Sequence, residues 1–108
     1  MADSYKVLGQ SIPTAATLVD LYTVPAARQA STSSINVCNQ GAATTFRVMV
    51  APAGAADAPV HRQFFDVPID ANETINAVIG WTLDATDKVR CQSASGSVSF
   101  GLYGVEIF

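Results

Sequence analysis

The residue types that could carry out catalysis are scarce in this chain, and its single imidazole is that of His61. A serine or cysteine nucleophile would need this histidine as its base, with a third group to orient it. His61 stands beside Arg62 at the expected start of a strand, where no Cys, Asp or Glu converges on it to complete a metal site. The G-x-S-x-G pattern of a nucleophile elbow is absent. We therefore predict no catalytic residue, no metal, no cofactor and no enzymatic activity.

Carboxylates gather in two turn-like segments of the sequence. The first segment contains Asp66, Asp70 and Glu73, and the second contains Asp84 and Asp87. Two close carboxylates can act as a general acid and base, and the oxygen donors around residues 70–73 are of the kind that Ca²⁺ binds. The spacing of an EF-hand loop is absent. Asp and Asn at turns commonly accept hydrogen bonds from the nearby backbone, and we favour this turn-capping role.

The two cysteines, Cys38 and Cys91, both fall inside strand-like segments. Their spacing matches no zinc or redox motif. A disulfide between two sheets is one interpretation. The other, which we favour, is a pair of free thiols that pack as small apolar side chains.

The composition leaves little charge for the surface of the folded chain. Its 108 residues correspond to one domain, residues 1–108. Only 14% of the residues are charged, against about 25% in ordinary soluble domains. Much of the surface must then consist of Ser, Thr, Asn, Gln and Ala. Because the centres of protein interfaces are depleted of charge, we expect a neighbouring chain to cover part of it.

Charge and hydropathy patterns argue against two classes of partner. The net charge is −3, and the six Lys and Arg residues are scattered rather than gathered in a stripe, so we expect no nucleic-acid binding. No apolar run approaches the roughly 20 residues of a membrane-spanning helix. The N-terminal residues MADSYKVLGQ lack the apolar region of a signal peptide. We expect a protein made in the cytoplasm that does not contact a membrane.

Short runs rich in Val, Ile, Thr, Phe and Tyr recur about every ten residues between turn residues, and no segment has a helical apolar stripe. The expected strands are residues 5–8, 17–24, 33–39, 44–50, 62–67, 73–81, 88–92 and 97–108. This pattern predicts an all-β fold: a single-domain antiparallel β-sandwich of about eight strands, either a jelly roll or an Ig-like Greek key. Residues 1–5 are expected to form an N-terminal arm, and the alternation in 62–67 places Phe65 inward and Phe64 outward.

The last expected strand changes its pattern part of the way along. Val98, Phe100 and Leu102 share one face, whereas the apolar residues that follow, from Tyr103 to Ile107, have the opposite parity. We expect a second chain to cover the added apolar face. The alternative is a β-bulge near Gly101 that buries all of these residues internally. The predicted protein-contact residues are Tyr5, Phe64, Tyr103, Val105, Ile107 and Phe108.

Several segments of the sequence resemble small virion structural proteins of tailed bacteriophages, especially those that infect marine and freshwater bacteria. These segments are LGQ (8–10), TLVDLYTVPA (17–26), VCN (37–39), FRV followed by PAGA (46–55), DVPI (66–69), LDATD (83–87) and SFGLYGVEI (99–107). The resemblance covers nearly the whole chain.

The resemblance implies a protein assembled in the host cytoplasm and located in the virion. Its expected role is that of a capsid decoration or cement protein that binds the head lattice, with the major capsid protein, other virion proteins and copies of itself as partners. One alternative is a neck, baseplate or tail-fibre component. A more remote alternative is a carbohydrate-binding module for host attachment, with Trp81 near Asp70 and Asn72.

Overall fold

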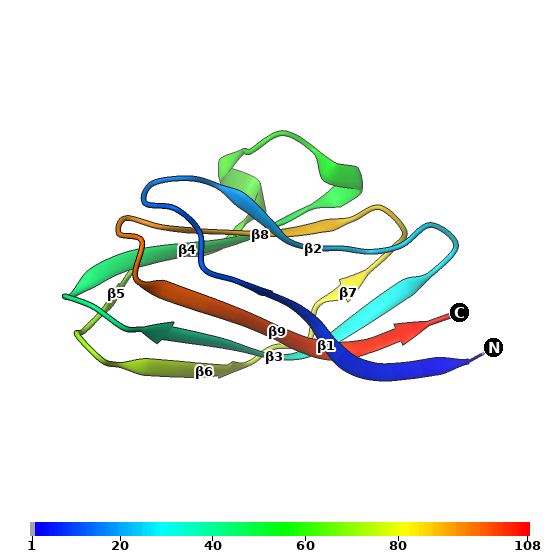
Figure 1. Cartoon of the computed structure of the whole chain (residues 1–108). Helices are drawn as coiled ribbons and strands as arrows, with labels where there is room; N and C mark the ends of the chain where they lie inside the picture. The colour runs from blue at the N-terminus through cyan, green and yellow to red at the C-terminus, as the bar shows by residue number, and fades with distance from the viewer. Residues whose placement is uncertain (1) are drawn as a thin grey trace.

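The computed structural model describes residues 2–108, in which two antiparallel β-sheets pack face to face (Figure 1). The strands are β1 (Asp3–Ser11), β2 (Val19–Thr23), β3 (Gln29–Asn39), β4 (Thr44–Ala51), β5 (Arg62–Ile69), β6 (Thr74–Val78), β7 (Thr82–Leu83), β8 (Lys88–Ser93) and β9 (Val98–Ile107). One sheet has the order β1-β9-β3-β6, with β7 also paired to β3, and the other has the order β2-β8-β4-β5. The predicted all-β sandwich is confirmed.

The strand order follows from folding the chain in half and then rolling it up. The fold point lies at residues 52–61, where two 3-10 turns (Pro52–Gly54 and Pro59–His61) separate β4 from β5. Each strand before this point pairs with one after it: β4 with β5, β3 with β6, β2 with β8 and β1 with β9. Rolling this double ribbon adds the pairs β3–β9 and β4–β8. This topology is a jelly roll, which decides between the two predicted architectures.

The core lies between the two sheets, where alternate side chains of facing strands meet. Phe46 of β4 and Phe100 of β9 are both almost fully buried, and their rings meet edge to face with centroids 5.9 Å apart. Such an aromatic pair adds roughly 0.5–1.5 kcal/mol to the stabilisation from burial alone. Ile35 and Leu102, which are partners in the β3–β9 register, extend this core along the sheet.

A β-bulge in β5 reverses one prediction made from simple alternation. Asp66 has a φ of 50°, and the segment from Phe64 to Val67 lies opposite the shorter segment from Phe46 to Val48 in β4. The extra residue turns Phe64 toward the core and leaves Phe65 50% exposed on the outer side. The predicted inward Phe65 and outward Phe64 are therefore wrong, because a bulge of this kind leaves no signal in the apolar pattern.

The expected strand 73–81 is divided in the structure. β6 ends at Val78, and the Trp81 N–H donates to the Thr32 hydroxyl oxygen (2.9 Å) rather than to a backbone carbonyl. The short strand β7 then resumes pairing with β3.

The last strand, β9, keeps its alternation to the end. Leu102 and Glu106 both face the core side and are buried, so the side chains between them point outward. The register of β9 is uninterrupted, and the bulges lie in its neighbours instead, at Leu8 in β1 and Ser33 in β3. The alternative of a bulge near Gly101 is therefore wrong. The apparent change of phase arose because the one charged residue of this segment occupies an inward position.

The two ends of the described chain lie side by side at one end of the roll (Figure 1). The Phe108 N–H donates to the Ala2 carbonyl (2.8 Å), and β1 pairs with β9 from Asp3 onward. The predicted N-terminal arm is therefore wrong for residues 3–5, which are part of the sheet, and Met1 lies outside the described residues.

The loop at residues 51–61 arches over the outer side of the β2-β8-β4-β5 sheet (Figure 1). The Arg90 guanidinium holds it there by donating to the carbonyls of Ala55 (2.6 Å) and Gly54 (3.2 Å). Met49 lies on this outer side of the sheet and is only 1% exposed. Within residues 2–108 there is no helix of sufficient length and hydropathy to cross a bilayer.

Candidate contact surface

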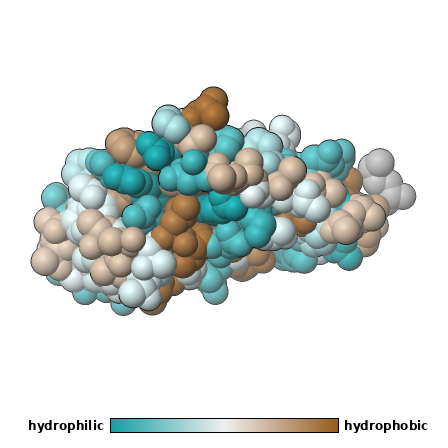
Figure 2. Space-filling model, turned by 90° about the horizontal axis from the view of Figure 1, so that it is seen from above, coloured by the Kyte–Doolittle hydropathy of each residue, from teal (hydrophilic) through white to brown (hydrophobic). Residues whose placement is uncertain are grey.

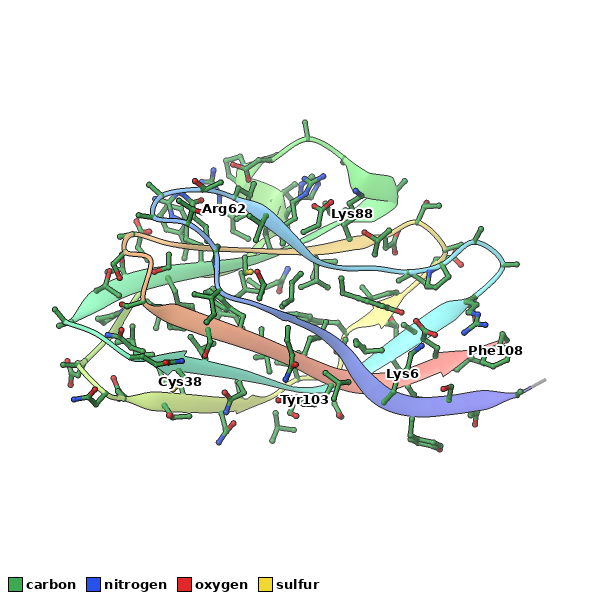
Figure 3. All side chains as sticks on the ribbon, in the orientation of Figure 1. Lys6, Cys38, Arg62, Lys88, Tyr103 and Phe108 are labelled. Atoms are coloured by element: carbon green, nitrogen blue, oxygen red, sulfur yellow. The ribbon has the colours of Figure 1, made fainter. Side chains whose placement is uncertain are left out.

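The outer face of the β1-β9-β3-β6 sheet carries almost no charge. The register places these residues on it: Asp3, Tyr5, Val7 and Gln10 of β1; Ser99, Gly101, Tyr103, Val105 and Ile107 of β9; Gln29, Ser31, Ser34, Asn36 and Cys38 of β3; and Thr74, Asn76 and Val78 of β6. Asp3, at the terminal end, is the one charged residue in this set. Figure 3 shows Tyr103 and Cys38 on the lower side of this sheet, away from the core.

A ridge of larger apolar side chains runs along the β1-β9 side of this face. Tyr5 lies directly opposite Val105, and Val7 lies directly opposite Tyr103. Tyr5 is 80% exposed and Val7 is 49% exposed. The two side chains of such a cross-strand pair contact each other but still expose their outward sides to solvent. Four of the six predicted contact residues therefore lie together on this nearly uncharged face: Tyr5, Tyr103, Val105 and Ile107.

Tyr103 lies flat along the sheet because residue 101 is a glycine. A Cβ atom at Gly101 would lie 2.8 Å from the Tyr103 hydroxyl oxygen, too close for unstrained contact. A shallow hollow of about 380 Å³ borders the ring. It is lined by Gln10, Ser11, Ile12, Asn36, Ser99, Phe100, Gly101 and Tyr103.

The other two predicted contact residues lie elsewhere. Phe64 packs inward, with its ring centroid 6.1 Å from that of Phe46 and 6.3 Å from that of Trp81. Phe108 lies at the end of the roll, where the Arg28 guanidinium stacks 3.9 Å from its ring centroid. Neither residue belongs to the uncharged face.

The basic side chains lie away from this face, and each is paired with a carboxylate. All six Lys and Arg side chains contact a carboxylate, in the pairs Lys6–Glu106, Arg28–Glu106, Arg47–Asp66, Arg62–Asp57, Lys88–Asp20 and Arg90–Asp20. The hydrogen bond from Lys88 holds the pKa of Asp20 below its ordinary value, and the hydrogen bond from Arg47 does the same for the pKa of Asp66.

The distribution of these groups is visible on the upper side of the molecule. Arg62 and Lys88 lie on this side in Figure 3. Figure 2, which looks down on it, shows hydrophilic residues spread over the surface and hydrophobic residues in small separate patches. The two sides of the sandwich therefore differ in character, and the uncharged sheet face is the side suited to contact with another chain.

A buried carboxylate that the sequence did not single out joins the two sheets. Glu106 is 1% exposed. Its Oε2 accepts from the Tyr22 hydroxyl (2.5 Å), and its Oε1 lies 2.7 Å from Lys6 Nζ and 2.8 Å from Arg28. Burial alone raises the pKa of Glu106, but the hydrogen bonds from Lys6, Tyr22 and Arg28 outweigh burial, and the net pKa is lowered. Burial and the same carboxylate raise the pKa of Tyr22. This cluster ties β1 and β9 to β2.

The residues considered for chemistry occupy structural positions. Glu73 Oε1 accepts from the Asp70 N–H (2.7 Å), and Asp87 Oδ2 accepts from the Asp84 N–H (2.9 Å). The predicted turn-capping role is confirmed for Glu73 and Asp87, whereas Asp66 lies within β5 and pairs with Arg47. His61 is half-buried, and its Nδ1 has no hydrogen-bond partner among residues 2–108. In the same range, no three His, Cys, Asp or Glu side chains gather closely enough to hold a metal ion.

Both cysteines are free thiols. Cys91 is buried in the core, and burial raises its pKa to about 12. Cys38 is half-buried on the outer face of the other sheet. The expectation of buried free thiols is confirmed for Cys91 and only in part for Cys38.

The residues considered for a sugar site are separated by the fold. Trp81 follows β6, and the turn that contains Asp70 and Asn72 precedes it, so they lie at opposite ends of this strand. Trp81 is also half-buried against Phe64 rather than exposed as a platform.

Comparison with known proteins adds no family assignment. No protein-family model matches the sequence, and no curated protein matches it. Among solved structures, the chain is similar to the capsid of Ralstonia phage GP4, with a TM-score of 0.45 and 13% identity over 97% of this chain and 82% of that chain. It is also similar to the Agl-KA catalytic domain, with a TM-score of 0.39 and 16% identity over 95% of this chain and 21% of that chain. Similarity at this level is no basis for assigning a function.

Proposed function

We propose that this jelly-roll protein is a non-enzymatic structural component of a bacteriophage virion, and specifically a capsid decoration or cement protein. The observation that carries the proposal is the segregation of charge: the outer face of the β1-β9-β3-β6 sheet is nearly uncharged, while all six basic side chains are paired elsewhere. The sequence segments that resemble phage virion proteins support it. Jelly rolls also occur in lectins and other proteins, so the fold by itself does not select a function.

The contact would be made by a sheet face rather than by a strand edge. β9 is hydrogen-bonded on both sides, to β1 and to β3, so its backbone has no free edge for a partner strand. The last strand would therefore contribute Tyr103, Val105 and Ile107 through their side chains. Burial of apolar area contributes about 25 cal/mol per Å², and Tyr residues are frequent anchors of such interfaces. Tyr5, the most exposed member of the ridge, is the strongest candidate anchor.

The test is a quantitative gel of purified particles that measures the molar ratio of this protein to the major capsid protein. We expect hundreds of copies per particle. A few to a few dozen copies would instead indicate a neck, baseplate or tail-fibre component, and absence from the particle would contradict the proposal.

A second candidate function is binding of a neutral saccharide during host attachment. It is favoured by the hollow beside Tyr103, where the amide side chains of Gln10 and Asn36 flank an aromatic ring on an uncharged surface. A glycan array would test it, and we expect any ligand to lose affinity when Tyr103 is replaced by Ala. An array without binders would remove this candidate.

A further inference from the structure

The sandwich has one sheet edge that lacks the usual protection against strand addition. Exposed edges normally carry bulges, charges or proline, which prevent another strand from pairing with them. β5 has Pro68 and the bulge at Asp66, β2 is bulged at Leu21, and β1 is bulged at Leu8. β6, the outermost strand of the lower sheet in Figure 1, has none of these features. Its sequence TINAV contains no charge, proline or glycine, and its register with β3 is uninterrupted.

The free hydrogen-bonding groups of this edge can be assigned from the bonds that flank it. The Asn39 N–H donates to the Glu73 carbonyl (2.9 Å), and the Ile79 N–H donates to the Ser33 carbonyl (3.0 Å). Because hydrogen-bonded pairs alternate along an antiparallel ladder, the odd-numbered residues of β6 bond to β3. The N–H and C=O groups of Thr74, Asn76 and Val78 therefore point away from the sheet.

We propose that β6 is a self-association site, at which a second copy of this chain pairs antiparallel with it about a two-fold axis at Asn76. In this register Asn76 lies opposite Asn76 of the copy, and Thr74 lies opposite Val78 of the copy. Every outward N–H and C=O of the strand then finds a partner. An isologous contact of this kind closes on itself as a dimer.

The side chains of β6 are complementary to themselves in this register. On the outer face, the copy's Thr74 covers part of Val78, which is 94% exposed. The Asn76 Oδ1 already accepts from Asn36 Nδ2 (2.6 Å), which leaves the Asn76 amide N–H groups free to donate across the axis. On the inner face, Ile75 lies opposite the small Ala77 of the copy.

The absence of charge along β6 also allows a second copy to approach. Residues 74–83 contain no charged side chain, so two copies meet along this edge without repulsion between like charges. The proposal places Glu73, the nearest acid, opposite Ile79 of the copy rather than opposite another carboxylate.

An apolar seam beside β6 gives the dimer a hydrophobic contribution. Half-buried side chains fill the side of the sandwich between β5 and β6: Phe64, Val67, Ile75, Ala77, Ile79 and Trp81. A strand added to β6 brings Ile75 and Ala77 of the copy to the margin of this seam. The contact uses the backbone edge of β6, at the far side of the sheet from the ridge on β1 and β9, so the inference does not depend on the proposed function.

The experiment measures the mass of the purified full chain by sedimentation velocity at micromolar to near-millimolar concentrations. We expect a dimer for the natural sequence. Asn76→Lys and Asn76→Glu each place like charges opposite each other at the axis, so each variant alone should dimerise at least about tenfold more weakly. An equal mixture of the two variants should recover a heterodimer, because opposite charges then face each other.

Two controls separate this site from other causes. Gln10→Lys changes an exposed residue on the opposite edge strand of the same sheet and should leave the dimer intact. Circular dichroism and thermal unfolding should show that the Asn76 variants remain folded. The proposal is overturned by a monomer at every concentration, by a dimer that survives both charged variants, or by a mixture that stays monomeric. Dimer loss in Tyr5→Lys but not in the Asn76 variants would place self-association on the apolar ridge of β1 and β9 instead.

Discussion

At the scale of single residues, the most consequential group is a carboxylate that the sequence pattern disguised. Glu106 is the one charged residue in an apolar strand end, and carboxylates are rarely buried unless they are paired. The structure buries it between Lys6, Arg28 and the Tyr22 hydroxyl. Because a charge in the interior needs partners to offset its lost hydration, this cluster fixes the relative position of three strands.

Replacing Glu106 tests the importance of this cluster. Glu106→Gln keeps the shape of the side chain but removes the charge that Lys6 and Arg28 share. We expect the free energy of unfolding, measured in urea, to fall by about 1–3 kcal/mol. Asp66→Asn is the control, because it removes a carboxylate from an exposed pair with Arg47. Its effect should be much smaller, and equal effects of the two changes would contradict this role of Glu106.

The same carboxylate predicts how stability depends on pH. The folded-state pKa of Glu106 lies below its ordinary value of 4.5, so the unfolded chain binds protons first as the pH falls. Its contribution is therefore fully present above about pH 4.5 and is lost as the pH falls through the folded-state pKa. Asp20 and Asp66, whose pKa values are also lowered, act in the same direction. Urea unfolding between about pH 7 and about pH 3 should show this loss of stability in the natural chain. The loss should be smaller in Glu106→Gln. An identical pH dependence of stability in the two proteins would contradict this role of Glu106.

At the scale of strands, alternation and turn residues predicted most of the elements but not their bulges. The expected strand 44–50, for example, matches β4 within one residue. The bulge at Asp66 inverted the assignment of Phe64 and Phe65, because its positive φ is set by pairing with β4 rather than by local sequence. The grouping of Tyr5 and Val7 with Tyr103 and Val105 on one face likewise depends on the pairing of β1 with β9. The sequence alone does not specify that pairing.

Close packing of β9 against its neighbours makes one glycine hard to replace. A Cβ atom at Gly104 would lie 2.3 Å from the Ser31 carbonyl oxygen, whereas a Cβ atom at Gly80 would meet nothing within 4 Å. Gly104→Ala should therefore force a backbone shift and lower the free energy of unfolding by about 1–3 kcal/mol. Gly80→Ala should leave it nearly unchanged. Thermal or urea unfolding of both variants checks this, and equal stabilities would show that β9 tolerates side chains here.

At the scale of the whole molecule, the two sides of the sandwich predict different responses to surface changes. Tyr5 and Val60 are similarly exposed, at 80% and 82%, but Tyr5 lies on the uncharged face and Val60 lies in the loop over the other sheet. On the proposed capsid role, Tyr5→Lys should weaken binding to phage heads that lack this protein at least about tenfold. Val60→Lys should bind as the natural chain does. Equal binding by both variants would exclude the outer face as the contact surface.

The pairing of Ala2 with Phe108 means that the backbone nearly forms a closed ring. A short linker across this junction, with new termini opened within residues 52–61, would give a circular permutant with every strand pair retained. Cargo fused at the opened loop would project from the charged side, opposite the uncharged sheet face. The roll is therefore a natural scaffold for displaying foreign peptides on any surface to which that face attaches.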